Sequence, residues 1–239
     1  MILELYKKEL LENGFTVIND IFSTEEVEQI ISVIESADST KSTFRKSADL
    51  FAIRQFLKEI PAVQKILLND KLRDIIYELF GKNYFITKSI YFDKPEQSNW
   101  FVAYHQDLTI SVDKKIELKD FGSWTTKQNQ FSVQPPIEFL ESNFTIRVHL
   151  DNTNENNGAL KVISNSHTKG IYRADSINWE TEKESICTTL KGGIMIMRPL
   201  LLHSSSRTIN NSKRRVIHIE FSDRELNSEL NWSERLNLK

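Results

Sequence analysis

The sequence predicts a mainly β protein of the α+β class, in which a helical N-terminal layer covers a β-sandwich or barrel. In the first third of the chain, up to Gly81, apolar residues recur at helical spacing. The remainder holds short runs of β-branched and aromatic residues separated by turn-forming stretches. The chain has 239 residues and no internal repeat, so we expect residues 1–239 to form one domain.

The N-terminal layer is expected to span residues 1–82. Residues 15–18 are β-branched and aromatic and suit a short strand. Ser23 and Glu26 have the spacing of a capping box, which predicts that a helix begins there. An apolar stripe at helical spacing follows this cap and is formed by Val27, Ile30, Ile31 and Ile34.

Two further helical segments complete this layer. One begins at an Asn69 or Asp70 cap and ends at Gly81. Residues 51–68, which lie between the two capped helices, are expected to be helical with a break at Pro61.

The β core is expected over residues 83–225. The turn-forming stretch "DNTNENNG", residues 151–158, separates two of its strands. Residues 113–141 are aromatic and polar and contain Pro135-Pro136, so we expect an insertion or a lid there. The predicted core strands cover residues 84–92, 144–150, 159–164, 193–197 and 216–221.

Composition excludes several classes of function. The formal net charge is -2, with 31 basic and 33 acidic residues, so neither nucleic acid nor a membrane is an expected partner. Residues 1–15 lack the apolar core of a signal peptide, and no segment is long and apolar enough to span a membrane. The single cysteine, Cys187, excludes an intrachain disulfide and favours a reducing compartment. We therefore expect a cytoplasmic protein; nothing in the sequence indicates its oligomeric state.

The sequence "YHQD" places His105 two residues before Asp107, and "HLD" repeats the spacing with His149 and Asp151. On an extended strand, side chains two residues apart leave the same face. A mononuclear iron(II) site for oxygen chemistry uses two imidazoles and one carboxylate, and it leaves the opposite side open. Either pair could supply two of these ligands, with His203 as the third.

Strand counting favours the first pair. Between Asp107 and His203 there is room for several strands and a long loop, whereas only two or three strands fit between Asp151 and His203. Asp151 also opens the turn-forming stretch, where an aspartate commonly caps its own backbone. His105, Asp107 and His203 are therefore the predicted metal ligands. The two remaining histidines, His167 and His218, are expected to be structural.

Arg214 follows His203 at the start of a predicted strand, and Ser205 lies two residues after this histidine. A planar guanidinium suits the carboxylate of a cosubstrate, and the serine hydroxyl could bond to the same group. Taken alone, Arg214 would be a solvated charge beside Lys213 and Arg215. Other catalytic schemes have little support, because no reactive-cysteine environment, nucleophile elbow, P-loop or dinucleotide fingerprint is present.

Taken in order, "YHQD", "HLDNTNENNGALKVISNSHTKG" and "PLLLHSSSRTINNSKRRVIHIEFS" resemble the phytanoyl-CoA dioxygenase family of iron(II)- and 2-oxoglutarate-dependent oxygenases. The N-terminal "LLENGFTVINDIFSTEEVEQI" is similar to the opening strand and helix of this family, so the resemblance covers nearly the whole chain. It implies a double-stranded β-helix, also called a jelly roll, with a helical N-terminal layer. Residues 113–141 match no named substrate site.

The resemblance also implies residue roles. His105, Asp107 and His203 match the iron ligands, and Arg214 and Ser205 match the positions that hold the distal carboxylate of 2-oxoglutarate. Related halogenases replace the carboxylate ligand with a small residue, so the presence of Asp107 favours hydroxylation or another oxidation.

The expected reaction uses O2 to oxidise a small organic molecule and releases succinate and CO2, with ascorbate as a possible reductant. Three residues of the expected lid, Trp124, Lys127 and Gln134, are candidate substrate contacts. One alternative is a cupin-like metalloenzyme that does not use 2-oxoglutarate and would not need Arg214. The other is a non-catalytic β-helix binding module.

Overall fold

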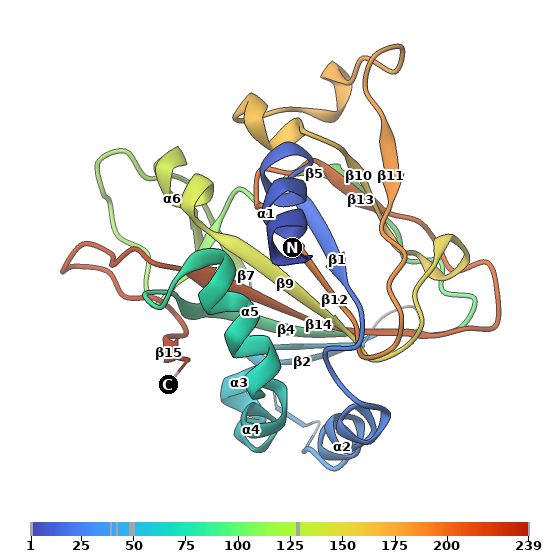
Figure 1. Cartoon of the computed structure of the whole chain (residues 1–239). Helices are drawn as coiled ribbons and strands as arrows, with labels where there is room; N and C mark the ends of the chain where they lie inside the picture. Colours follow the sequence, from blue (N-terminus) through green and yellow to red (C-terminus); the bar gives the residue numbers. More distant parts are fainter. Residues whose placement is uncertain (1, 39, 42, 48–50, 128–129, 239) are drawn as a thin grey trace.

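The computed structural model describes residues 2–38, 40–41, 43–47, 51–127 and 130–238, and it contains three antiparallel sheets (Figure 1). The main sheet has the strand order β1-β12-β9-β14-β4-β3-β2, and β15 also pairs with β4. Its strands are β1 (Phe15–Ile18), β12 (Ile194–Met197), β9 (Phe144–His149), β14 (Arg214–Ser222), β4 (Phe85–Lys94), β3 (Phe51–Arg54), β2 (Phe44–Lys46) and β15 (Leu236–Asn237).

The second sheet has the order β11-β10-β13-β5 and packs against the main sheet. Its strands are β11 (Glu184–Ile186), β10 (Leu160–Ile163), β13 (His203–Ser205) and β5 (Val102–His105). A small hydrophobic cluster joins Val162 of β10 to Met195 and Met197 of β12 and so fills part of the space between the sheets. This is the sandwich of two antiparallel sheets that the strand pattern predicts.

Helices cover the outer face of the main sheet, and α3, α4 and α5 lie together on that side in Figure 1. Ser23 caps α2 in a complete capping box, and the Asn69 side chain caps α5, which ends at Gly81, so both predicted caps are confirmed. The helices are α1 (Ile2–Glu12), α2 (Thr24–Glu35), α3 (Phe56–Glu59), α4 (Gln64–Leu67), α5 (Asp70–Phe80) and α6 (Ile137–Ser142), and the 3-10 segments are η1 (Pro61–Val63), η2 (Glu155–Asn157), η3 (Ser166–Lys169) and η4 (Ala174–Ser176).

The prediction of a helix over residues 51–68 is wrong at its start. Residues Phe51–Arg54 form β3 and pair with β4, while α3, η1 and α4 follow only from Phe56 onward. The backbone of Gln55 is left-handed, with φ 51°, and marks the change from strand to helix. The free hydrogen-bonding edge of β4 decides the conformation of this apolar run, because local pattern does not distinguish a short buried strand from a helix.

The segment expected to be an insertion or lid is built around a third sheet. β8 (Gln130–Gln134) lies between β6 (Ile110–Val112) and β7 (Gly122–Lys127), and α6 follows. One face of this sheet packs in a second hydrophobic cluster that includes Val133, Leu140 and Trp232. Residues 128 and 129 of the expected segment lie outside the described residues.

Alternation along β9 and β14 separates an apolar outer face from a polar inner face. Phe144, Ile146 and Val148 belong to the large cluster under the helices. The residues between them on β9 point the other way, as the two-residue period of a strand requires. Thr145, Arg147 and His149 of β9, together with Arg214, His218 and Glu220 of β14, are all buried on the inner side.

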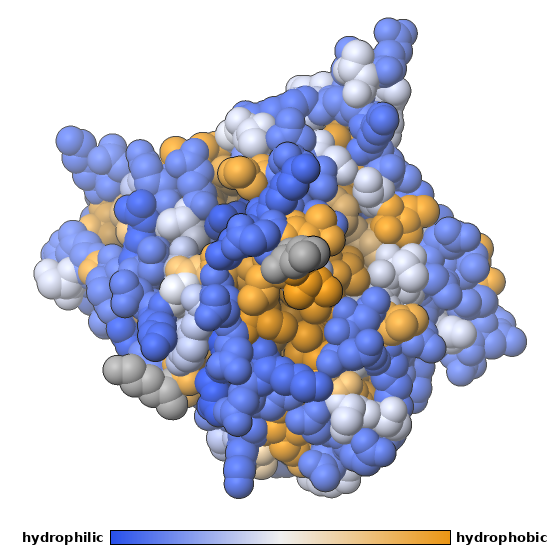
Figure 2. All heavy atoms as spheres, in the orientation of Figure 1, coloured by the Kyte–Doolittle hydropathy of each residue, from blue (hydrophilic) through white to orange (hydrophobic). Residues whose placement is uncertain are grey.

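The visible face of the molecule is largely hydrophilic, with apolar side chains gathered around α1 (Figure 2). Ile2, Leu5 and Leu11 of α1 are exposed by 64%, 50% and 75%. Among the described residues, no helix is both long enough and apolar enough to cross a membrane.

Truncation of Phe144 should destabilise the fold strongly. Its ring stacks at 3.7 Å from the ring of Phe80 and at 4.6 Å from that of Phe221, and all of it is buried. Phe144→Ala should lower the free energy of unfolding by about 3–5 kcal/mol, because the cavity cannot collapse between stacked rings. Urea denaturation measures this, and Phe101→Ala, at a position 54% exposed, serves as the control. Equal losses in the two variants would contradict the packing argument.

Candidate metal centre

Two histidines face each other across neighbouring strands. His203 of β13 is the register partner of His105 of β5, and the centroids of the two rings are 4.3 Å apart. Asp107 lies between their tips: its Oδ1 is 3.9 Å from Nε2 of His105, and its Oδ2 is 3.8 Å from Nε2 of His203. The three ligand atoms lie within 4.8 Å of one another, so one metal ion can reach all three.

Each histidine is held in the tautomer that a metal requires. Nδ1 of His105 lies 2.8 Å from the carbonyl oxygen of Ala103, and Nδ1 of His203 lies 2.8 Å from that of Leu201. A carbonyl only accepts, so both Nδ1 atoms carry the proton, and both Nε2 lone pairs point at the shared centre.

Asp107 is oriented by the residue between the two ligands. β5 ends at His105, so Asp107 lies just beyond the strand rather than on it. The buried Gln106 fixes this turn: its amide donates to the carbonyls of Leu200 and Gly170, and its Oε1 accepts from the backbone N–H of Tyr172. The N–H of Asp107 donates to the carbonyl of Pro199 at 3.0 Å.

The centre fits a divalent cation by its donor set and by its unsatisfied atoms. Oδ2 of Asp107 is buried and makes no hydrogen bond to any residue that the structure describes. Burial, with smaller effects from neighbouring charges, lowers the pKa of His203 to about 4, so this imidazole is neutral near pH 7. Burial alone would raise the pKa of Asp107, but the positive charge of neighbours, His203 first, outweighs it and holds the pKa below the usual value. The set therefore offers two imidazole nitrogens and one carboxylate.

The ligands are unequally exposed. The His105 side chain is 41% exposed, that of Asp107 is 22% exposed and that of His203 only 5%. The centre is therefore closed on the His203 side and open beside His105. An open coordination side is what distinguishes a catalytic site from a structural one.

A buried ionic network lies beneath Asp107 on the inner face of the main sheet. His218 lies 3.1 Å from Nη1 of Arg147 and 3.0 Å from Oε1 of Glu220, which also pairs with Lys88 at 2.7 Å. His218 was expected to be merely structural, yet its ring and the Glu220 carboxylate both lie within 4.8 Å of Asp107. Arg147 and Lys88 thus face the carboxylates of Glu220 and Asp107. This pairing of opposite charges offsets the cost of removing all four groups from water.

A second polar group of residues lies further along the inner face, around Arg214. This side chain is 2% exposed, and its Nη2 lies 3.4 Å from Oγ of Ser205. Its Nε and Nη1 have no partner among the described residues, and the same holds for Nε2 of His149 on the neighbouring strand. Buried donors without partners are costly, so the geometry calls for an acceptor here.

Lys94 adds a second cation beside Arg214. It is fully buried, donates to the carbonyl of Ser206 and lies 5.8 Å from the centroid of the Trp100 ring. Burial, and then the charge of Arg214, lower its pKa to about 7. Gly158, with φ +83°, lets the backbone approach: a Cβ there would lie 2.7 Å from Nζ of Lys94 and 3.3 Å from Oγ of Ser205. The cluster of Arg214, Lys94 and Ser205 suits the carboxylate of a dianion.

The second His-x-Asp pair lies outside the metal centre. Nδ1 of His149 is 2.8 Å from Oγ1 of Thr153. Asp151 accepts from the backbone N–H and the guanidinium of Arg215, with the shortest contact at 2.7 Å. Asp151 thus pairs with an arginine across strands rather than capping its own turn, while His149 borders the Arg214 cluster.

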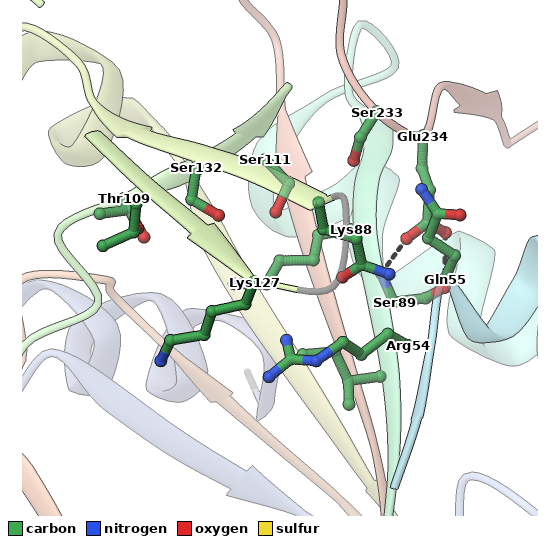
Figure 3. A pocket seen from close by; sticks show the side chains of 13 residues that line it. Arg54, Gln55, Lys88, Ser89, Thr109, Ser111, Lys127, Ser132, Ser233 and Glu234 are labelled. Atoms are coloured by element: carbon green, nitrogen blue, oxygen red, sulfur yellow. Dashed lines mark hydrogen bonds between the residues drawn. The ribbon is translucent and has the colours of Figure 1, made fainter. Parts of the chain in front are cut away.

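The three candidate substrate contacts separate in the structure. Lys127 lines a polar cavity together with residues of the main sheet and of the third sheet (Figure 3). Trp124 packs against the second hydrophobic cluster on the other face of the same sheet. Gln134 is not among the residues that line the cavity; it pairs with Gly122 at the far end of β8.

Sequence reasoning missed Lys94, Gly158 and the network of Arg147, His218, Glu220 and Lys88. The only available signal was charge at inward positions of strands, since Arg147, His149, His218 and Glu220 interrupt otherwise apolar runs. The sequence of a single segment does not specify which strands are neighbours, and so it does not show which charged side chains come together.

Two imidazoles and a carboxylate on a double-stranded β-helix, open on one side, define the class of mononuclear non-haem iron oxygenases. The sequence pattern of the family "Phytanoyl-CoA dioxygenase (PhyH)" matches residues 10–216. The chain therefore belongs to the phytanoyl-CoA dioxygenase family, which confirms the predicted class, an iron(II)- and 2-oxoglutarate-dependent dioxygenase. The family match names no substrate for this chain.

Solved structures share the fold. The non-haem α-ketoglutarate-dependent carbocyclase SnoK from nogalamycin biosynthesis aligns with a TM-score of 0.67 and 12% identity, over 93% of this chain and 84% of that one. EctD from S. alaskensis with bound Fe aligns with a TM-score of 0.69 and 18% identity, over 90% and 75%. The epimerase SnoN in complex with Fe3+, α-ketoglutarate and nogalamycin RO aligns with a TM-score of 0.67 and 11% identity, over 93% of this chain and 84% of that one. Comparison with curated proteins finds no relative by sequence.

The two His-x-Asp pairs provide a matched test of the metal ligands. Asp107→Asn should weaken binding of Co(II), used as a spectroscopic substitute for iron, by roughly 100-fold or more, because it removes the only anionic ligand. Asp151→Asn should leave Co(II) affinity unchanged and lower the unfolding temperature, since it removes the ion pair with Arg215. Visible absorption during Co(II) titration measures both. Equal Co(II) affinity in the two variants would contradict the assignment.

Lys94 should take up a proton when a dicarboxylate binds. With a pKa near 7 it is mostly neutral at pH 8, and a carboxylate beside it favours the charged form. Binding of 2-oxoglutarate at pH 8 should therefore be accompanied by uptake of up to about one proton per site, and affinity should fall as pH rises above 7. Calorimetry in two buffers of different ionisation enthalpy measures the uptake. Lys94→Met should abolish it, and undiminished uptake in this variant would exclude the role of Lys94.

Proposed function

We propose that the protein hydroxylates a small organic substrate, using iron(II), 2-oxoglutarate and O2, and releases succinate and CO2. His105, Asp107 and His203 would hold the iron. The observation that carries this assignment is the convergence of their three ligand atoms within 4.8 Å, around a buried carboxylate oxygen without a partner.

Arg214, Ser205 and Lys94 would hold the distal carboxylate of 2-oxoglutarate. Two unpartnered guanidinium nitrogens, a hydroxyl within 3.4 Å of Arg214 and a second cation support this role. A cupin-like enzyme without 2-oxoglutarate would have no use for the unpartnered guanidinium donors of Arg214. Their presence therefore favours the dicarboxylate over the alternative chemistry.

Iron(II), when bound with its cosubstrate, supplies the activation of O2 that inserts one oxygen atom into a substrate C–H bond and the other into succinate. The protein's own residues provide geometry. The carbonyls of Ala103 and Leu201 hold Nδ1 of each imidazole and so aim Nε2 at the centre, and Gln106 fixes the turn that carries Asp107. The network under Asp107 keeps that carboxylate charged in a buried site.

Hydroxylation, or a related oxidation, is the outcome that the ligand set favours. The related halogenases need a small residue in place of the carboxylate ligand, and this chain has Asp107 there. Ascorbate would serve only to keep the metal reduced. A cytoplasmic location is part of the proposal, since the one cysteine, Cys187, is a buried free thiol.

An anaerobic mixture of protein, iron(II) and 2-oxoglutarate should develop a visible absorption band from the metal–cosubstrate complex. On exposure to air with ascorbate, and without added substrate, it should form succinate slowly. Asp107→Ala should lose both signals, because the metal is no longer held. Arg214→Ala should keep metal binding but lose the band at 2-oxoglutarate concentrations that saturate the wild type.

The three readings of the site give different results. Absence of the band in the wild-type protein would sink the proposal, and metal binding without any response to 2-oxoglutarate would indicate the cupin-like alternative. A protein that binds neither the metal nor 2-oxoglutarate would fit the alternative of a non-catalytic β-helix binding module. Lys115→Gln, at an exposed position away from the centre, is the control and should behave as the wild type.

A further inference from the structure

A polar cavity of about 160 Å³ lies beside the metal centre, between the inner face of the main sheet and the third sheet. Figure 3 shows its side chains converging from both walls. Of the residues that line it, only two have been given a part in the site so far: Lys127 as a candidate substrate contact and Lys88 as the ion-pair partner of Glu220.

One wall is a row of hydroxyl groups set by strand register. Ser132 of β8 pairs with Ser111 of β6 on one side and with Thr125 of β7 on the other, so the three side chains lie in line across the sheet. All three line the cavity, as does Thr109, two residues before Ser111. The opposite face of the same strands is apolar and packs in the second hydrophobic cluster. Period-two alternation thus turns only polar groups toward the cavity.

The other wall is cationic. Arg54 of β3 and Lys88 of β4 line the cavity from the main sheet, and Lys127 of β7 reaches it from the third sheet. In Figure 3 the Arg54 and Lys127 side chains extend toward the same side. Neither has a hydrogen bond or ion pair to any residue of the described chain, although Arg54 is half-buried and burial lowers its pKa.

The acidic groups nearby neutralise these two cations only in part. Glu220 pairs with Lys88 at 2.7 Å. Glu234, the one carboxylate that lines the cavity among the described residues, accepts from the backbone N–H and the hydroxyl of Ser89, at 2.9 and 2.6 Å. Arg54 and Lys127 thus bring two positive charges to the cavity against the single negative charge of Glu234, so the lining keeps a net positive charge.

The cavity adjoins the metal on the side away from Arg214. Inward positions of β14 run from Arg214 through His218 to Glu220, a span of about 20 Å. His218 and Glu220 lie beside Asp107, and Lys88 continues from Glu220 into the cavity. The Arg214 cluster, the metal centre and the cavity therefore follow one another in the direction in which β14 runs.

We propose that this cavity binds the substrate, and that the substrate is a small hydrophilic organic anion. Arg54 and Lys127 bind its carboxylate or phosphate, and the row of Ser111, Ser132 and Thr125 bonds to its hydroxyl or amino groups. The proposal rests on the proposed function, because it places the oxidised C–H bond beside the metal held by Asp107. It excludes a fatty acyl chain, for which this wall offers no apolar surface.

The size of the cavity agrees with this class. A protein cavity of about 150 Å³ holds a benzene molecule, so a volume of about 160 Å³ accommodates a compound of comparable size, such as a small hydroxy acid or amino acid. A planar guanidinium binds carboxylate or phosphate through two parallel bonds, and a lysine adds charge without geometric demand.

The test uses probes that share one skeleton: D-glycerate, glycerol 3-phosphate and glycerol, with hexanoyl-CoA as the acyl probe. A wider set of small amino and hydroxy acids, phosphate esters and their neutral analogues extends the comparison. Each is titrated by calorimetry into wild-type protein, both metal-free and loaded anaerobically with iron(II) and 2-oxoglutarate. Arg54→Gln and Lys127→Gln are the test variants, and Lys115→Gln is the control.

At least one anion of the set should bind the wild type more tightly than its neutral analogue and should accelerate succinate formation. Arg54→Gln should weaken that binding roughly 10- to 100-fold and Lys127→Gln by less, because Lys127 is exposed. The carboxylate and phosphate probes distinguish which anionic group is preferred. Both variants should keep the visible band with iron(II) and 2-oxoglutarate.

The inference would be overturned if no anion binds more tightly than its neutral analogue, if Arg54→Gln binds as the wild type does, or if hexanoyl-CoA binds best. Each of these results can occur while the visible band still forms, in which case the proposed function stands and only the substrate class fails. If the anion binds but the visible band does not form, the cavity is an anion site and the proposed function fails.

Discussion

The direct pairing of His105 with His203 is the contact on which the functional site depends. It joins the edge strand β5 to β13 in the second sheet, and it brings together two residues that lie far apart in the sequence. Because the two positions are register partners, a slip of one residue would turn one imidazole away from the centre. The buried Gln106 then adds the third ligand by fixing the turn after β5.

The inner face of the main sheet shows how charge is tolerated inside a sandwich. Arg147 and Lys88 face Glu220 and Asp107, so the buried charges balance near the metal centre. Around Arg214 the balance fails, because Lys94 adds a second cation and no acidic partner is present among the described residues. A dianionic cosubstrate would restore it. The same reasoning, applied to Arg54 and Lys127, points to an anionic substrate on the other side of the metal.

Most of the fold could be predicted from local signals. The capping box at Ser23, the Asn69 cap and the run of strand-like segments each depend on residues close together in sequence. Residues 51–54 could not, because an apolar run of four residues suits either a strand or a helix, and the free edge of β4 decides between them. The third sheet was likewise hidden, since its strands are short and its polar face resembles that of a loop.

The amino-acid sequence predicted the class of chemistry: a His-x-Asp pair, a distant histidine and an arginine, in the order found in the family, indicate iron and 2-oxoglutarate. It did so because these groups are rare, and each has a narrow range of uses. Tertiary structure alone decided that Lys94 joins Arg214, that His218 and Glu220 support Asp107, and that three hydroxyls form one wall. Strand neighbours set those contacts, and strand order is a property of the whole chain rather than of any segment.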